Sequence, residues 1–518
     1  MRILIKRSTI IIEDYVLGNC TKLERSFMIF NKVYHRYNWK GAYYSPDEHR
    51  LYLPRGVNIG WLEHLLQCPS YMEEEFDPID QISPVMIKYL PRDKDQETAL
   101  EFILGNGDYL ANRYKPQLSV NLNTGKGKTY VTIAASSFLL VRTIMITSNI
   151  DWINQWRDCI LEYTDTKPEE IYIIAGAISI TKLKRGIHDI SKIKYILASH
   201  STIQSYASKH GWPAVGELFR FLKVGFKVYD EAHLYFDNIC MIDFFTNTYR
   251  SIYLTATPAR SDRNENQIYQ KSLKAMPKID LFHPDDDPHT QYISIQYNTH
   301  PNPYELNSCS TGYGFSMIKY AGYVVHKPIF YKMLYIIIDM CLKIDGKVLM
   351  YIGTIDSILQ IYNWMIQAFP FLDGNIGIYN SSIPKEEKDF QLEKKFILTT
   401  TKSCGAAMDI KGLKATVLLA EPFKSEVLAR QTLGRTRDEN TSYIELVDTG
   451  FGAIRNYYYK KLKVFNKYAT KCSNILLNDR LIDDKYTELY WKYNERTLDY
   501  LEEMKKGLPK VFHHIKKE

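Results

Sequence analysis

The sequence is poor in the features that mark secreted, zinc-bound and membrane-spanning proteins. Its eight cysteines are scattered over 518 residues and form no Cys-x-x-Cys pair, so neither a zinc site nor a disulfide framework is indicated. An apolar run over 9–12 is interrupted by Glu13 and Asp14 too early for a signal peptide. The longest apolar stretch elsewhere, near 334–342, is too short to span a bilayer and contains Asp339. We therefore expect a cytoplasmic protein without a signal peptide or transmembrane segment.

Charge of either sign is also in little excess. The 66 Lys and Arg residues against 59 Asp and Glu leave a net charge of +7, which permits polyanion binding without arguing for it. With 45% apolar and 24% charged residues the composition is that of a globular protein rather than a disordered one. The length exceeds what one hydrophobic core serves and predicts about three or four domains.

One segment has the composition of a phosphate-binding loop. Residues 123–129 read Asn-Thr-Gly-Lys-Gly-Lys-Thr, between a predicted strand over 117–122 and a predicted apolar helix over 130–140. A glycine-rich turn in this order points backbone N–H groups at a phosphate, and the helix N-terminus adds partial positive charge. An ordinary glycine turn is the alternative, but the strand, loop and helix order favours phosphate binding. The candidate cofactor-binding residues of the loop are Thr124, Gly125, Lys126, Gly127, Lys128 and Thr129.

Two adjacent carboxylates further along the chain supply a candidate metal site. Asp230 and Glu231 follow the apolar-leaning stretch 224–228. A solvated acidic pair is the alternative, yet two carboxylates at the end of a buried strand are costly without a cation. We expect Thr129 and Asp230 to hold Mg²⁺, Glu231 to orient the attacking water, and Lys128 to reach the β- and γ-phosphates of ATP.

From these two elements onward the chain resembles a superfamily 2 helicase, over residues from near 88 to 450. The strict phosphate-loop pattern has a further glycine where this chain has Leu122, and nucleic-acid motor proteins often lack that glycine. The resemblance implies an α/β fold with two tandem RecA-like parallel-sheet lobes and a motor of the DEAH-box type. Within the superfamily the chain looks most like the phage recombination and repair helicases that drive branch migration.

The resemblance also implies roles for residues around the loop. Gln96 is expected to read the adenine edge of ATP. His233, Thr255 and Thr257 are expected to couple the ATP site to the nucleic-acid path, although a β-branched edge strand is the alternative for the two threonines. The residues implied to contact the nucleic-acid backbone in the first lobe are Thr147, Ser148, Asn149, Ser199 and Thr202.

The second half carries its own set of implied residues. Thr354, after a predicted strand over 346–353, and Thr400, near the end of one over 396–401, resemble backbone-binding residues. Asp409 is expected near the ATP ribose, although it lies further from Gly405 than that element's usual spacing.

The last motor element reads Gln-Thr-Leu-Gly-Arg-Thr-Arg and resembles Gln-x-x-Gly-Arg-x-x-Arg. Its candidate catalytic residues are Gln431, Arg435 and Arg437, with the second arginine one position early and Asp438 in its usual place. We expect these arginines to stabilise charge on the transferring phosphoryl group, whereas a solvated basic turn is the alternative.

Motif order predicts five regions. They are a small N-terminal α+β accessory domain over 1–88, a first lobe over 89–275, a linker or insertion over 276–325, a second lobe over 326–470 and a helical tail over 471–518. The N-terminal domain interleaves aromatic and basic residues, as a nucleic-acid platform does, or else packs these rings into its own core. These residues are Tyr34, His35, Arg36, Tyr37, Trp39, Lys40, Tyr43, Tyr44 and Arg50.

The function that follows is an ATP-dependent DNA helicase or translocase. ATP is expected between the two lobes, and hydrolysis to open and close their cleft while backbone contacts step along one strand irrespective of base sequence. Forked, branched or single-stranded DNA is the expected partner, in viral replication, recombination or repair within the host cytoplasm. An RNA-remodelling or transcript-release motor on the same scaffold is one alternative. A nucleotide-gated DNA-binding clamp without significant turnover is another.

Overall fold

The computed structural model describes residues 1–31, 35–122, 126–148, 150–255, 262–281, 290–312, 314–404, 410–433, 440–477 and 491–493. The chain divides into two compact units, Met1–Phe282 and His283–Glu518, which are described separately below.

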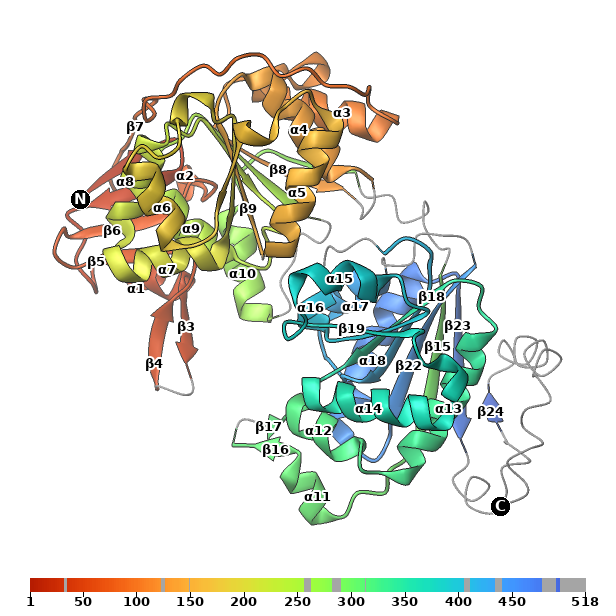
Figure 1. Cartoon of the computed structure of the whole chain (residues 1–518). Helices are drawn as coiled ribbons and strands as arrows, with labels where there is room; N and C mark the ends of the chain where they lie inside the picture. Colours follow the sequence, from red (N-terminus) through yellow and green to blue (C-terminus); the bar gives the residue numbers. More distant parts are fainter. Residues whose placement is uncertain are drawn as a thin grey trace, which may run out of the picture. The chain divides into compact units, whose positions relative to one another are not determined.

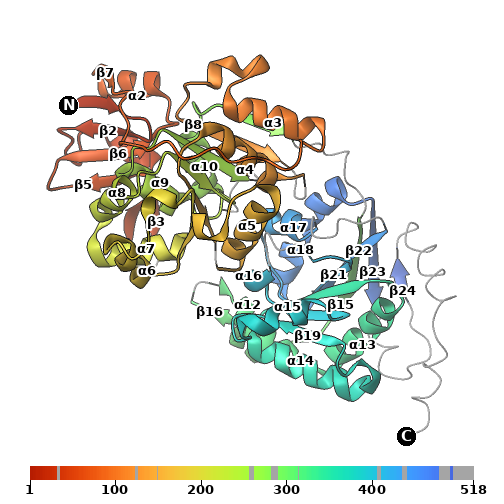
Figure 2. The ribbon, with the colours of Figure 1, turned by 45° about the horizontal axis from the view of Figure 1, so that its top comes forward.

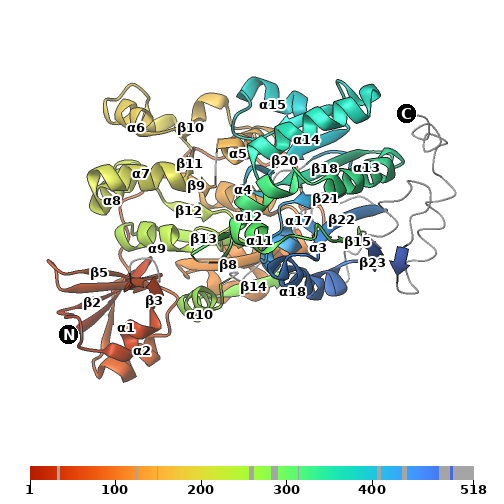
Figure 3. The ribbon, with the colours of Figure 1, turned by 90° about the horizontal axis from the view of Figure 1, so that it is seen from below.

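A seven-stranded sheet, all of whose pairs are parallel, forms the centre of the first unit. Its strand order is β10-β11-β9-β12-β13-β8-β14 (Figure 3). Parallel neighbours need long crossovers, and the helices between successive strands provide them. The strands are β8 (Gln117–Leu122), β9 (Thr143–Thr147), β10 (Ile171–Ile174), β11 (Tyr195–Ser199), β12 (Phe226–Tyr229), β13 (Arg250–Thr255) and β14 (Lys278–Leu281). The strand and helix predicted on either side of the glycine loop are confirmed, since they match β8 and α4.

Helices cover both faces of this sheet. In β9, Met145 belongs to one hydrophobic cluster while Ile144 and Ile146 belong to the other, because successive strand residues point to opposite faces. One face packs against α3 (Lys94–Leu104), α4 (Lys128–Leu139) and α5 (Ile150–Tyr163). The other contacts α6 (Ala177–Lys184), α7 (His200–His210), α8 (Trp212–Phe221), α9 (Phe236–Phe245) and α10 (Arg263–Ser272). Burial on both faces explains why inner strands such as β9 (TIMIT) and β11 (YILAS) are mainly apolar.

The N-terminal region forms a five-stranded sheet of order β5-β6-β2-β1-β7 beside α8 and α9 (Figure 2). Its elements are β1 (Arg2–Ile5), β2 (Thr9–Glu13), α1 (Thr21–Ser26), β3 (Met28–Asn31), β4 (Arg36–Trp39), β5 (Tyr43–Ser45), β6 (Arg50–Pro54), α2 (Ile59–Leu66) and β7 (Ser70–Met72). Tyr52 of β6 stacks on Phe245 of α9, with ring centroids 5.6 Å apart. The α+β region therefore shares one hydrophobic core with the first lobe.

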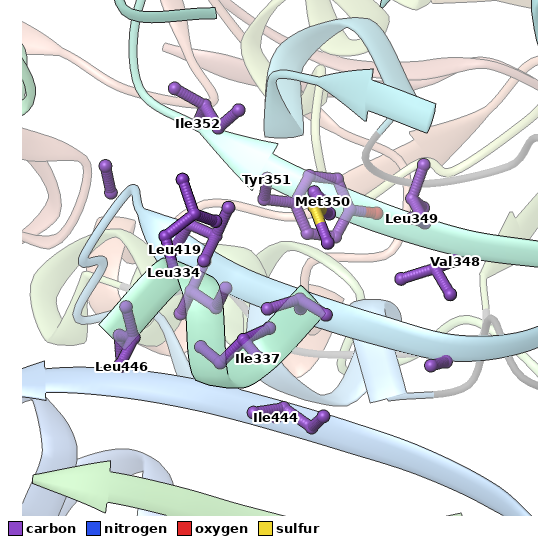
Figure 4. Close-up of a cluster of buried hydrophobic side chains, with 14 of the residues drawn as sticks. Leu334, Ile337, Val348, Leu349, Met350, Tyr351, Ile352, Leu419, Ile444 and Leu446 are labelled. Carbon is purple, nitrogen blue, oxygen red and sulfur yellow. The ribbon is translucent and has the colours of Figure 1, made fainter. Parts of the chain in front are cut away.

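The second unit has an eight-stranded sheet of order β19-β20-β18-β21-β22-β15-β23-β24, parallel except for the pair β23 and β24. Leu334 and Ile337 of α13 pack on Met350 of β18 and Ile444 of β22 in its core (Figure 4). The strands are β15 (Thr290–Tyr297), β16 (Ser310–Thr311), β17 (Gly314–Phe315), β18 (Lys347–Ile352), β19 (Ile376–Tyr379), β20 (Phe396–Thr399), β21 (Leu413–Ala420), β22 (Thr441–Asp448), β23 (Lys471–Leu477) and β24 (Trp491–Tyr493). The helices are α11 (Pro303–Ser308), α12 (Met317–Val324), α13 (Pro328–Leu342), α14 (Ile355–Ala368), α15 (Lys385–Leu392), α16 (Thr401–Cys404), α17 (Glu426–Leu433) and α18 (Gly452–Tyr468).

Two predicted regions differ from the structure. The segment 276–325, expected as a linker or insertion, holds β14 of the first sheet and β15, an inner strand of the second. The tail over 471–518, expected to be helical, begins with β23 and contains β24, which pair antiparallel. None of these four strands pairs with its partner across a short turn, so the local sequence pattern did not identify them. The rest of the tail lies outside the described residues.

All eight cysteines are free thiols. Among the described residues, no helix combines the length and apolar character that crossing a membrane requires.

A buried carboxylate in the first unit accepts hydrogen bonds from four surrounding side chains. Asp243 accepts hydrogen bonds from the Lys227 ammonium, the Tyr229 hydroxyl at 2.7 Å, the Gln117 amide at 3.0 Å and the Tyr253 hydroxyl. Lys227 is fully buried in an ion pair with it. Removing one member of such a pair leaves an uncompensated charge in the core.

Substitution Asp243→Ala should lower the free energy of unfolding by about 3–5 kcal/mol, because Lys227 loses its counter-charge. Urea denaturation measures the change. Asp80→Ala is the matched control, since the Lys223–Asp80 pair has side chains 47% and 43% exposed and should contribute less than about 1 kcal/mol. Equal losses in the two variants would contradict the assigned role.

Candidate nucleotide-binding site

The phosphate-loop candidate lies between a fully buried strand and a helix. Among the described residues, no side chain caps the N-terminus of this helix. β8 ends at Leu122 and α4 begins at Lys128, with Gly127 at its N-cap in the left-handed region at φ 85°. The first-turn N–H groups of a helix have no intrahelical acceptor, so this end suits an anion. Thr124 and Gly125 lie outside the described residues.

Gln96 is buried and bound to the loop. Its amide Nε2 donates to the Lys126 carbonyl at 3.1 Å, and its Oε1 accepts from the Arg92 backbone N–H at 2.9 Å. A Cβ at position 127 would stand 2.2 Å from that Nε2, so both this approach and the positive φ require Gly127. Gln96 thus fixes the loop from behind, and its contact with adenine stays a prediction.

The two predicted carboxylates lie together at the carboxyl end of β12. Asp230 Oδ2 accepts from the Trp156 indole N–H at 3.1 Å, and Oδ1 accepts from the Glu231 backbone N–H at 3.0 Å. Lys128 Nζ is 3.6 Å from Glu231 Oε1, and both side chains are largely buried. The structure therefore brings together the predicted lysine of the loop and the predicted acidic pair, two elements far apart in sequence.

The electrostatics of this cluster are unfavourable to a second negative charge. Burial, and then the neighbouring charge of Glu231, raise the pKa of Asp230 to about 6, although Lys128 and the Trp156 hydrogen bond act in the opposite direction. Glu231 also adopts φ 47°, which costs free energy for a residue other than glycine. One lysine does not neutralise two carboxylates in a buried site, so the cluster is suited to a cation.

Magnesium fits the donors that the structure supplies. Glu231 Oε2 is buried without a hydrogen-bond partner among the described residues, and His233 Nδ1 lies 3.4 Å from it. The half-buried Thr129 stands on the first turn of α4. Bound Mg²⁺, held by Thr129 and Asp230, would supply positive charge to the phosphates. Among the described residues, no group of three or more His, Cys, Asp or Glu side chains is arranged to hold a metal ion by itself.

The predicted coupling residues form a direct link to the acidic pair. His233 Nδ1 and the Thr255 hydroxyl lie within hydrogen-bonding distance, 2.8 Å apart, and Thr255 is the last residue of β13. β12 and β13 are neighbours in the sheet, so this contact joins two strand ends. Thr257 lies outside the described residues.

Hydroxyl residues predicted to contact nucleic acid sit at carboxyl strand ends in both units. Thr147 ends β9 and Ser199 ends the adjacent β11. In the second unit, Thr354 and Thr400 follow the adjacent strands β18 and β20. Ser148 is half-buried after β9, and Asn149 lies outside the described residues.

Several of these hydroxyls also begin helices, which the sequence reading did not identify. Ser199 accepts from the Thr202 N–H at 3.1 Å and caps α7, and Thr354 accepts from the Ser357 N–H at 3.1 Å and caps α14. Thr400 likewise accepts from the Ser403 N–H at 3.1 Å. Capping uses one lone pair of each oxygen, so a phosphate contact stays a prediction for these residues.

The remaining second-half candidates cannot be placed at side-chain level. Gln431 belongs to α17, but its side chain is outside the described set, and Asp409, Arg435 and Arg437 lie outside the described residues.

The sequence reading assigned no role to two side chains, Trp156 and Glu421, that lie beside strand ends. Trp156 orients Asp230, as described above. Glu421, directly after β21, accepts from the Thr401 N–H at 2.8 Å and from the Thr401 hydroxyl. Burial raises the pKa of Glu421 to about 7. A carboxylate directly after a buried apolar strand, as at Asp230, was the signal available for it.

The N-terminal aromatic and basic residues separate into two groups. Lys40 pairs with Asp237 at 2.7 Å, Tyr43 packs on Phe245 and Arg50 pairs with Glu13. These side chains, and Tyr44 beside Tyr15, support the packing alternative. His35 and Tyr37 instead have exposed rings on or beside the β3–β4 hairpin. Trp39 of the same hairpin packs against the core, and Tyr34 lies outside the described residues.

Comparison with known proteins agrees with this geometry. The family model for the Type III restriction enzyme, res subunit (ResIII), matches residues 89–260, which hold the loop and the acidic pair. The DNA 3'-5' translocase XPB2 of Sulfurisphaera tokodaii is 28% identical over 167 residues, 31% of this chain and 33% of that protein. The DNA 3'-5' helicase XPB of Kineococcus radiotolerans is 29% identical over 150 residues, 29% of this chain and 25% of that protein. The matched region is thus a third or less of the length of these curated relatives.

The fold also has a counterpart among solved structures. S. cerevisiae Dbp5 bound to RNA and ADP BeF3 aligns over 80% of this chain and 93% of its own, with a TM-score of 0.50 and 13% sequence identity. This likeness concerns the fold alone. It confirms the predicted fold class of two tandem RecA-like lobes.

The raised pKa of Asp230 has a measurable effect on stability. Because its folded-state pKa exceeds the ordinary value, the associated stability is complete near pH 4 and is lost as pH rises through about 6. Asp230→Asn removes this loss and should make the nucleotide-free, magnesium-free protein more stable than wild type by about 1–3 kcal/mol near pH 7.5, and equally stable near pH 4.

Urea denaturation across this pH range provides the measurement. Asp158→Asn, at an exposed pair with Arg157, is the control and should follow the wild-type profile. An Asp230→Asn protein less stable than wild type near pH 7.5 would show that the carboxylate is held by protein contacts alone.

Proposed function

We propose that the protein is an ATP-dependent DNA helicase or translocase of superfamily 2. The observation that carries the proposal is the buried cluster of Lys128, Asp230 and Glu231 behind the N-terminus of α4. A phosphate-binding helix end, a lysine and an uncompensated carboxylate pair are what Mg²⁺-ATP hydrolysis needs. The match of residues 89–260 to a ResIII model and the similarity to DNA translocases support a nucleic-acid-dependent ATPase.

Residues of the first unit have different roles in the proposed hydrolysis. Lys128 neutralises charge on the β- and γ-phosphates, and the α4 N-terminus binds phosphate oxygens through its backbone N–H groups. Glu231 holds the attacking water, while Trp156 keeps Asp230 in its orientation. His233 and Thr255 link Glu231 to the end of β13. A displacement of Glu231 on phosphate release would therefore be transmitted to a second strand.

DNA is the proposed partner because the relatives matched by sequence are named as DNA 3'-5' motors. Within that class we favour remodelling of forked or branched DNA in viral replication, recombination or repair, in the host cytoplasm. The small β-rich N-terminal region, which precedes the two lobes in the sequence, supports the choice of DNA substrate. The free cysteines suit the proposed reducing cytoplasm.

Lys128→Ala should lose ATPase activity by at least about 10²-fold while keeping DNA affinity within about twofold, because phosphate charge is neutralised by this side chain and nucleic acid is bound elsewhere. Phosphate release and fluorescence anisotropy measure the two properties. Lys94→Ala, which alters an exposed lysine on α3, is the control. Unchanged turnover in Lys128→Ala would exclude the assigned loop.

The type of nucleic acid is determined by comparing how forked DNA, duplex DNA, single-stranded DNA and RNA stimulate ATP hydrolysis. We expect the largest stimulation from forked DNA. Stronger stimulation by RNA would favour the RNA-remodelling alternative. ATP binding with almost no phosphate release on any nucleic acid would favour the clamp alternative.

We further propose that Arg435 and Arg437 contribute positive charge to the transferring phosphoryl group. The double variant Arg435→Ala/Arg437→Ala should reduce kcat by roughly 10³-fold or more with little change in ATP affinity, because arginine fingers act mainly in the transition state. Phosphate release at saturating ATP measures kcat. A variant with lowered affinity and unchanged kcat would contradict this role.

A further inference from the structure

A pocket of about 600 Å³ opens in the first unit between α1, the β3–β4 hairpin and α10. We call it the hairpin pocket. Figure 1 shows β3 and β4 extending from the N-terminal region as an arm, with α1 and α10 at its base. The pocket shares no residue with the nucleotide-binding site. Its lining includes Lys22, Arg25, Phe30, Tyr37, Gln267 and Lys271.

The charges of the hairpin pocket are all positive. Lys22, Arg25 and Lys271 line it, and its lining contains no carboxylate. The structure records no ion pair for these three residues within the described part of the chain. Lys40, at the end of the same hairpin, has two carboxylate partners, Asp237 at 2.7 Å and Glu265 at 3.3 Å. Within the described residues, the three cations of the hairpin pocket therefore have no carboxylate to balance their charge.

Lys22 and Lys271 are close enough to affect each other. Burial lowers the pKa of Lys271, and the charge of Lys22 lowers it further. The Lys271 ammonium lies over two aromatic rings, 5.9 Å from the Phe27 centroid and 5.1 Å from the Trp61 centroid. Lys22 and Arg25 lie three residues apart on α1 and thus face the same side of that helix. An anion between these cations would relieve their repulsion.

Aromatic rings stand beside the cations. Phe30 and Tyr37 are directly opposite each other on the two strands of the hairpin, and they are 45% and 64% exposed. Their ring centroids are 5.2 Å apart with an interplanar angle of 62°. Exposed rings on a projecting hairpin offer flat apolar surfaces that the protein's own core does not cover.

We propose that the hairpin pocket binds a single-stranded segment of nucleic acid, with Lys22, Arg25 and Lys271 on its phosphates and Phe30 and Tyr37 stacked on its bases. Cations alone would suit any polyanion, but rings interleaved with cations match alternating bases and phosphates. Duplex bases are already stacked, which favours a single strand. This inference rests on the proposed function. It adds a nucleic-acid-binding site to the one predicted for the hydroxyl residues at the strand ends of the two lobes.

Binding of a fluorescein-labelled single-stranded oligonucleotide to the full chain, without ATP, tests the proposal. Lys22→Ala/Arg25→Ala should weaken binding by about tenfold or more at moderate salt and reduce the slope of log K against log salt by about 1.4, as expected for two lost phosphate contacts. Lys167→Ala/Lys209→Ala is the matched control, since it removes two exposed lysines of the first unit outside the pocket. Its slope and affinity should stay close to wild type.

A second pair of variants tests the rings. Tyr37→Ala should weaken binding about 5- to 100-fold because a stacking surface is lost, whereas Tyr37→Phe should bind as wild type. Thermal midpoints should be unchanged in all four variants, since the altered side chains are exposed. Hydrolysis of ATP without nucleic acid should also be unchanged.

Wild-type affinity and salt slope in Lys22→Ala/Arg25→Ala would overturn the pocket proposal. So would competition by polyglutamate as effective as by unlabelled oligonucleotide, with Tyr37→Ala neutral, which would indicate an acidic protein partner. In both cases stimulation of the wild-type ATPase by DNA would leave the proposed function standing. Absence of that stimulation in wild type would count against the proposed function itself.

Discussion

Two buried carboxylates that share one lysine are the constraint on which the first unit depends. Asp230 and Glu231 follow a strand and are largely buried, so water screens their charges little, and Lys128 balances only one of them. An arrangement of this kind is costly in the ligand-free protein, and a bound cation such as the proposed Mg²⁺ would offset that cost. The raised pKa of Asp230 and the left-handed backbone of Glu231 each indicate a free-energy cost at this site in the ligand-free protein.

The parallel sheet is what makes this concentration of charge achievable. Helices on both faces bury the inner strands, so polar groups of the site lie where these strands end. The loop after β8, the acidic pair after β12 and Thr255 at the end of β13 occupy the carboxyl edge of neighbouring strands. The N-terminal sheet shares its core with the helix layer on one face, so it and the hairpin pocket belong to the same compact body as the nucleotide site.

Much of the site was predictable because its chemistry is local in sequence. The strand and helix around the glycine loop, and the adjacent carboxylates, each follow from a few consecutive residues. Ser199 and Thr354 were less predictable, because a hydroxyl after a strand suits both a helix cap and a phosphate. β15 was missed because its sheet partners, β22 and β23, lie far along the chain. The role of Trp156 was not predicted, since its hydrogen bond to Asp230 exists only in the folded structure.

We propose that bound Mg²⁺ and nucleotide, rather than protein contacts, keep Asp230 ionised. Titration calorimetry of Mg²⁺-ADP binding in buffers of different ionisation enthalpy counts the protons released. Near pH 6, where Asp230 is half protonated, wild type should release about half a proton more than Asp230→Asn, and the difference should vanish near pH 8. Equal proton release by the two proteins near pH 6 would contradict the account.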